Sequence, residues 1–246
     1  MADWLAEAAG VRPEAPALIL EGGAVTYAEL DGAADAVAAP VAGGGFGPGE
    51  RVAFWGENTV RAVAAVWGLP RAGTWAVPVS IQLPAAEAMR LTRAAGVRGL
   101  WAPSRLDLPR PARARGPEGG WGPPDGSARY VVFTSGSSGG RKGAILGGTN
   151  VAASVAASQR RLGNGPDDRW LCVLPLAHVG GLSILWRSAA AGGAVVLENG
   201  FDPDRCARLL ASGDVSFASL VPTQLRRILA RHPGPYAGLR AVLLGG

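Results

Sequence analysis

The chain has 246 residues, of which 48% are hydrophobic and 17% are charged. This balance argues against intrinsic disorder, because such a chain can bury a large apolar core. The net charge of +5 comes from arginines spread along the whole sequence, so it gives little support to a nucleic-acid partner.

The N-terminal residues and the two cysteines restrict the class further. Residues 1–7 provide neither a basic n-region nor an apolar h-region, so we expect no secretory signal and a cytoplasmic location. Cys172 and Cys206 lie far apart within apolar stretches. We therefore expect small buried side chains there, rather than disulfide partners or metal ligands. No stretch favours a membrane-spanning helix.

Residues 1–102 form the first predicted region, in which strands and helices alternate. A hairpin is expected over 17–27 around Gly22 and Gly23. Thr26 and Glu29 have the spacing of a capping box and predict a helix that ends at Pro40. The later elements have apolar strands or helices with one apolar face: strand 51–55, a helix from residue 59, strand 75–79, helix 84–95 and strand 97–101.

Residues 103–128 differ from their surroundings in composition. They are rich in arginine, proline and glycine and have almost no periodic apolar residues. This pattern predicts an exposed connector between the two regions.

The second region, residues 129–246, returns to the alternation. Asp202 followed by Pro203 predicts a helix start. The other expected elements are strands 129–134, 169–174, 194–197, 215–221 and 239–244, and helices 149–162, 181–190 and 222–231. Repeated strand and helix units with apolar strands predict an α/β fold of mostly parallel sheets flanked by helices.

The segment 130–143 carries the strongest chemical signal. It joins an apolar strand to a run of hydroxyls and glycines that ends at Lys142, the only lysine among 24 basic residues. Glycines allow several backbone N–H groups to point at one spot, hydroxyls add donors, and an ammonium group neutralises negative charge. We therefore expect this segment to bind the phosphates of ATP or another nucleotide.

Two known loop types can be compared with this segment. A Walker loop requires glycine where Arg141 stands and serine or threonine where Gly143 stands, so it does not fit. A nucleophile elbow, G-x-S-x-G, does fit at residues 136–140 and would make Ser138 the nucleophile of a serine hydrolase, with Asp214 and His232 as partners. The helix that should follow the serine directly is expected only near residue 149. This alternative stays open.

The same segment resembles a known family. Residues 134–143, TSGSSGGRKG, are similar to the phosphate loop of the adenylate-forming superfamily of AMP-binding enzymes, usually T-S-G-[ST]-T-G-x-P-K-G, with Arg141 in place of proline. Further similar stretches follow in the family's order: 25–30, 47–52, 71–78, 221–225 and 239–246. Within the superfamily, residues 171–188 are most similar to the 2-succinylbenzoate–CoA ligases of menaquinone biosynthesis.

The resemblance implies an ATP-dependent acyl-CoA ligase, which activates a carboxylic acid as acyl-AMP and transfers the acyl group to coenzyme A. ATP, Mg²⁺ and coenzyme A are the implied small molecules, and Lys142 and His178 the implied catalytic residues. The implied phosphate contacts come from Thr134, Ser135, Gly136, Ser137, Ser138, Gly139 and Lys142. The implied acyl pocket is bordered by His178, Gly180, Gly181, Gly245 and Gly246. No metal ligand is assigned.

The family's Y-G-x-T-E and T-G-D segments, and its C-terminal domain, have no counterpart in the sequence. We therefore expect residues 1–246 to be an incomplete N-terminal domain of the acyl-CoA synthetase type. A nucleotide-binding protein without full activity stays a second alternative. An interrupted sheet would leave an unpaired edge, so we also expect the isolated chain to aggregate or to form a molten state.

Overall fold

The computed structural model describes residues 2–101, 128–134 and 141–245. The chain forms two compact units. Unit 1 comprises Met1–Asp3, Asp31–Ser154 and Leu176–Val179, and unit 2 comprises Trp4–Leu30, Val155–Pro175 and Gly180–Gly246. These borders differ from the predicted division at residues 103–128, because strands from both parts of the sequence share a sheet. The predicted connector lies outside the described residues, except for its last residue.

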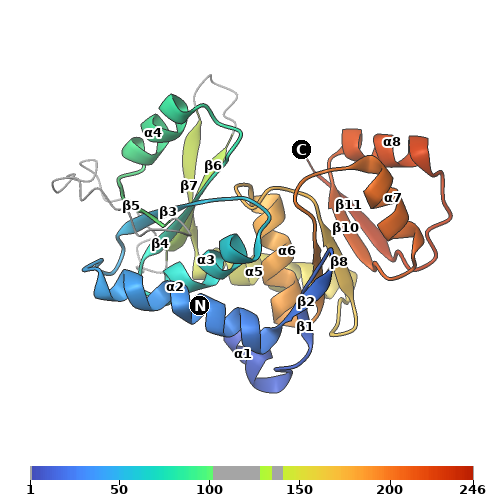
Figure 1. The fold of residues 1–246 in the computed structure, drawn as a ribbon, viewed down its shortest axis with the longest axis horizontal. Helices are drawn as coiled ribbons and strands as arrows, with labels where there is room; N and C mark the ends of the chain where they lie inside the picture. The colour runs from blue at the N-terminus through green and yellow to red at the C-terminus, as the bar shows by residue number, and fades with distance from the viewer. Residues whose placement is uncertain (1, 102–127, 135–140, 246) are drawn as a thin grey trace. The chain divides into compact units, whose positions relative to one another are not determined.

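Unit 1 contains a five-stranded sheet with the order β5-β3-β4-β6-β7 (Figure 1). Its strands are β3 (Arg51–Trp55), β4 (Trp75–Val79), β5 (Val97–Trp101), β6 (Ala128–Thr134) and β7 (Lys142–Gly147). Strands β3 to β6 pair in parallel, whereas β7 pairs antiparallel with β6. The first four strands confirm the sequence predictions. Strand β7 was not predicted.

Two helices cover opposite faces of this sheet. Ala88 and Leu91 of α4 (Ala85–Ala94) belong to the same buried cluster as Val131 and Phe133 of β6. Tyr130, which alternates with them along β6, donates its hydroxyl hydrogen to the Val66 carbonyl of α3 (Val60–Arg71) at 3.1 Å. The sheet is therefore buried on both sides, as the apolar strands predicted.

Unit 2 contains a six-stranded sheet with the order β11-β10-β8-β9-β1-β2. Its strands are β1 (Pro16–Leu20), β2 (Gly23–Thr26), β8 (Arg169–Cys172), β9 (Ala194–Leu197), β10 (Phe217–Leu220) and β11 (Ala241–Leu244). Only β1 and β2 pair antiparallel, as the predicted hairpin requires. All six strands confirm the predicted positions, with ends shifted by up to two residues.

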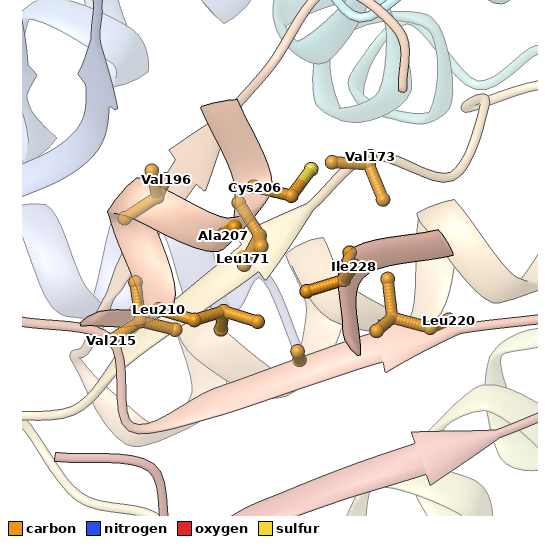
Figure 2. Close-up of a cluster of buried hydrophobic side chains, with 10 residues drawn as sticks. Leu171, Val173, Val196, Cys206, Ala207, Leu210, Val215, Leu220 and Ile228 are labelled. Carbon is orange, nitrogen blue, oxygen red and sulfur yellow. The ribbon is translucent and has the colours of Figure 1, made fainter. Parts of the chain in front are cut away.

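The core of unit 2 lies between this sheet and helices α7 (Pro203–Ala211) and α8 (Pro222–Arg231). Figure 2 shows Leu210 of α7 and Ile228 of α8 beside the strand residues Leu171 and Leu220. The opposite face carries Trp170, whose ring lies 5.6 Å from the guanidinium carbon of Arg187 in α6 (Val179–Ala191). This sheet is therefore also covered on both faces.

The remaining helices are α1 (Trp4–Val11), α2 (Tyr27–Gly43) and α5 (Gly148–Leu162). Helix α2 starts at the predicted capping box, in which the Thr26 N–H donates to the Glu29 carboxylate at 2.8 Å. It continues past Pro40, contrary to the prediction. The buried residues Val37 and Val41 flank this exposed proline, so their packing offsets the lost backbone hydrogen bond.

Within the described part of the chain, each helix is too short or too polar to cross a lipid bilayer. The architecture confirms the predicted α/β class, with mostly parallel sheets flanked by helices.

Candidate functional site

The β6–β7 hairpin brings together the two ends of the predicted phosphate loop. Thr134, the last residue of β6, is the register partner of Lys142, the first residue of β7. The Thr134 hydroxyl donates to the Lys142 carbonyl at 3.3 Å, and both side chains are exposed. The predicted residues Ser135, Gly136, Ser137, Ser138 and Gly139 lie outside the described residues. Their phosphate contacts stay predictions.

A second cation stands beside Lys142. The Nε atom of Arg141 donates to Oε1 of Glu87, in the first turn of α4, at 3.0 Å. About a third of each of these two side chains is exposed. Two positive residues therefore stand in succession where the chain enters β7, and the first of them is attached to a helix of the same unit.

The segment that carries His178 is bound to the end of β3. The Leu176 N–H donates to Oδ1 of the buried Asn58 at 3.2 Å, and the Ala177 N–H donates to the Gly56 carbonyl at 3.2 Å. A Cβ atom at Gly56 would lie 2.6 Å from the Ala177 nitrogen. Only glycine therefore allows this close approach, and it fixes the backbone just before His178.

The side chain of His178 is exposed, and its pKa is lowered. Desolvation by the surrounding protein, and secondly the positive charge of Arg141, lower the pKa of His178 below its ordinary value of about 6.5. The charge effect requires Arg141 and His178 to be near each other in unit 1. The structure therefore associates Thr134, Arg141, Lys142 and His178 within a single unit.

The predicted pocket glycines lie in unit 2. A Cβ atom at Gly181 would lie 2.5 Å from the Pro175 carbonyl oxygen, and one at Gly180 would lie 3.0 Å from a Leu174 methyl carbon. These glycines therefore let the first turn of α6 pack against Leu174 and Pro175, which follow β8. Gly245 donates its N–H to the Leu220 carbonyl at 3.1 Å, and Gly246 lies outside the described residues. Their acyl-pocket role stays a prediction.

The serine hydrolase alternative loses support from three features. Ser138 itself is not among the described residues, but the element after it is strand β7 and not the helix that a nucleophile elbow needs. Nδ1 of His232 accepts the Gly234 N–H at 3.1 Å, whereas a triad histidine must donate from that nitrogen. The third predicted member, Asp214, is paired with Arg169 at 2.8 Å.

The two cysteines are buried, as predicted. Burial raises the pKa of the Cys172 thiol to about 12 and that of the Cys206 thiol to about 11. Both thiols are therefore protonated near neutral pH, which makes them poor nucleophiles and poor metal ligands. Across residues 2–101, 128–134 and 141–245, no three histidine, cysteine or acidic side chains gather as metal ligands would.

Comparison with known proteins identifies the family. The model of the AMP-binding enzyme family matches residues 5–115 and 108–246, which together span almost the whole chain. The chain belongs to this family. The resemblance to the AMP-binding enzymes that residues 134–143 and the further stretches indicated is thereby confirmed.

Relatives within the AMP-binding enzyme family include a 2-succinylbenzoate–CoA ligase from Listeria monocytogenes serotype 4b (strain F2365). It is 32% identical over 264 residues, which cover 100% of this chain and 55% of that protein. Phenyloxazoline synthase MbtB from Mycobacterium tuberculosis (strain ATCC 25618 / H37Rv) is also 32% identical, over 96% of this chain and 18% of that protein. The chain thus spans about half the length of the ligases it matches.

Solved structures of AMP-binding enzymes have the same fold. The o-succinylbenzoate CoA synthetase (MenE) from Bacillus subtilis, in complex with the acyl-adenylate intermediate OSB-AMP, has a TM-score of 0.85 and 26% identity, over 100% of this chain and 68% of that one. The same synthetase with ATP and a magnesium ion has a TM-score of 0.84 and 28% identity, over 100% and 55%. The predicted acyl-CoA synthetase type of N-terminal fold is confirmed.

Proposed function

We propose that this chain is the N-terminal, nucleotide-binding part of an ATP-dependent acid–CoA ligase whose acid is 2-succinylbenzoate, in menaquinone biosynthesis. The observation that carries this proposal is the register pairing of Thr134 with Lys142. It holds a hydroxyl and the only ammonium side chain at the two ends of a glycine-rich and serine-rich segment. The similarity to 2-succinylbenzoate–CoA ligases supports the choice of acid.

The proposed residues can lower the electrostatic barrier of the proposed reaction. A carboxylate is a poor acyl donor, and attack on the α-phosphate of ATP converts it to an acyl adenylate with a good leaving group. The attacking anion approaches a polyanion, so fixed donors and positive charge near the phosphates lower the electrostatic barrier. Lys142 supplies such a charge. The exposed Thr134 hydroxyl donates its one hydrogen to the Lys142 carbonyl in this structure, and it would turn to a phosphate oxygen to act as a donor at the other end of the segment.

His178 is proposed to contact the acyl group. Its lowered pKa keeps the imidazole neutral near pH 7, so it can form hydrogen bonds without bringing a second charge to the acid. The Leu176 and Ala177 N–H groups bond to Asn58 and Gly56 and so hold the backbone that carries this imidazole. Fixed placement is what a group that orients a substrate requires.

The other proposed reactants are small molecules. A Mg²⁺ ion takes much of its coordination from phosphate oxygens and water, so a dedicated cluster of carboxylates is not needed at a nucleotide site. ATP and Mg²⁺ would therefore bind to the nucleotide site together, and coenzyme A would accept the acyl group. We propose a cytoplasmic location for this reaction. Neither a nucleic acid nor a membrane is proposed as a partner.

The experiment that tests the proposal is the exchange of labelled pyrophosphate into ATP, which reports formation of the acyl adenylate. We expect exchange to require 2-succinylbenzoate and to fail with benzoate or octanoate. Lys142→Ala should abolish this exchange, and Arg90→Ala, which removes an exposed cation on α4, should leave it unchanged.

Equal exchange with all three acids would contradict the assigned acid. ATP binding without exchange would favour the nucleotide-binding alternative, and fluorophosphonate labelling of Ser138 would favour the hydrolase.

A further inference from the structure

The ion pair between Arg141 and Glu87 connects the start of β7 to helix α4. Arg141 immediately precedes Lys142, and its Nε atom lies 3.0 Å from Oε1 of Glu87. Glu87 adjoins Ala88 in α4, which is 5% exposed and belongs to the buried core of unit 1. Glu87 is therefore carried by a backbone that packing holds in place.

The two ends of the phosphate segment are attached to this core in different ways. Thr134 continues directly from Phe133 of β6, whose side chain lies in the same buried cluster as that of Ala88. At the other end, Arg141 is the residue before β7 and is only partly buried. The pair with Glu87 thus gives the second end a side-chain attachment to the core that also holds the first end.

Position 141 is occupied by arginine, whose side chain can restrain the backbone through its pair with Glu87. The family's usual motif has proline there, and proline restricts the backbone by fixing φ. Arginine imposes no such restriction, so a side-chain contact of Arg141 can add to the restraint that the pairing of Lys142 with Thr134 gives. Arginine also keeps donors on its two Nη atoms when Nε is engaged, so the pair with Glu87 leaves donors that can face a phosphate.

We propose that Glu87 is a positioning residue for Lys142 and that it acts by holding Arg141 at the start of β7. This inference rests on the proposed nucleotide-binding function. Glu87 does not itself contact the nucleotide, since its carboxylate would repel the phosphates. It restrains the backbone on which Lys142 stands, and so replaces the restraint that proline gives.

A double-mutant cycle between Glu87 and Arg141 tests this inference. By calorimetric titration with ATP and Mg²⁺, Glu87→Gln should weaken binding about two- to fivefold, the range expected for a partly exposed ion pair. In an Arg141→Pro background, the same Glu87→Gln substitution should have no effect on affinity. Glu7→Gln is the matched control, because Glu7 also lies in the first turn of a helix, α1, and is exposed.

Hydrogen exchange of the amides in residues 142–147, measured without nucleotide, gives a second readout. Glu87→Gln should speed this exchange in the parent and leave it unchanged in the Arg141→Pro background. Equal effects of Glu87→Gln in both backgrounds, tighter ATP binding, or unchanged exchange would each overturn the inference. If the parent binds no ATP, the proposed function fails, whereas the exchange measurement still decides whether Glu87 positions the start of β7.

Discussion

Two residues at the end of β3, Gly56 and Asn58, hold the backbone that carries His178. Sequence reasoning did not single out either of them. Asn58 is separated from Leu176 by 118 positions, and no local pattern connects them. The signal that was available is a glycine directly after a buried strand, which often marks a close approach of two backbones. Lys142 and His178, in contrast, could be predicted as site residues because their motifs are local.

Replacement of Gly56 by alanine should destabilise the protein. The added Cβ atom would lie 2.6 Å from the Ala177 backbone nitrogen, which cannot move as a flexible side chain can. We expect a loss of about 1 to 3 kcal/mol in the free energy of unfolding, measured with urea. Gly32→Ala is the control, because Gly32 lies in helix α2 with open space around it, and it should stabilise the helix by up to about 1 kcal/mol. Equal effects of the two substitutions would contradict the close approach.

The charge of Arg141 should be measurable through His178. Because desolvation and Arg141 both lower the pKa of His178, Arg141→Gln should raise this pKa toward about 6.5. Proton NMR titration measures it, and His232→Asn assigns the two histidine signals. In the parent, His178 contributes stability above about pH 6.5 that is lost as the pH falls through its lowered pKa. Arg141→Gln should reduce this loss, and an unchanged pKa would show that Arg141 lies too far away.

At the scale of elements, the sequence predicted those parts whose signals are local. The hairpin at Gly22, the capping box at Thr26 and the helix start at Asp202 were all correct, because cap and turn residues act on their immediate neighbours. The apolar strands were also found. Their order within each sheet was not predicted, since it depends on pairing between distant segments.

Strand β7 and helix α1, which were not predicted, and helix α2, which is longer than predicted, each have a physical explanation. Residues 142–147 begin with Lys142 and Gly143, which are poor strand formers, and they form β7 only through antiparallel pairing with β6. Helix α1 contains Gly10 and buries only Leu5 and Ala8, so its periodic signal is weak. In α2, the buried valines outweigh the proline. Tertiary contacts decide the structure in each case.

The cap of α7 provides a test at this scale. The Asp202 carboxylate accepts the Arg205 backbone N–H at 2.6 Å, and α7 contributes Leu210 to the core in Figure 2. Asp202→Ala should therefore lower the free energy of unfolding by about 1 kcal/mol. Asp167→Ala should change it by less than about 0.5 kcal/mol, because the Asp167 side chain is 98% exposed. A null result for Asp202→Ala would mean that the cap does not stabilise the helix.

At the scale of the whole molecule, we expect the β11 edge of the unit 2 sheet to affect solution behaviour. Strand β11 is the outermost strand of that sheet and pairs with β10 on one side. Its last residue, Leu244, is 53% exposed. An apolar edge strand can pair with another chain, which favours aggregation.

We therefore expect the isolated chain to elute above its monomer mass of 25.0 kDa in size-exclusion chromatography with light scattering. Leu244→Lys should raise the monomer fraction, since a charge at an edge strand opposes pairing between molecules. Val11→Lys is the control, because Val11 is 80% exposed but lies on helix α1. A parent that is monomeric and melts in one sharp transition would contradict this expectation.

The central claim is that the segment between Thr134 and Lys142 binds the phosphates of a nucleotide. Calorimetric titration of the parent and of Lys142→Ala with ATP and Mg²⁺ tests it most directly, with Arg90→Ala as the control for loss of one exposed cation. We predict that the parent and Arg90→Ala bind with the same affinity and that Lys142→Ala binds at least about tenfold more weakly, as expected for loss of a charged hydrogen bond. Equal affinity of Lys142→Ala and the parent would contradict the claim.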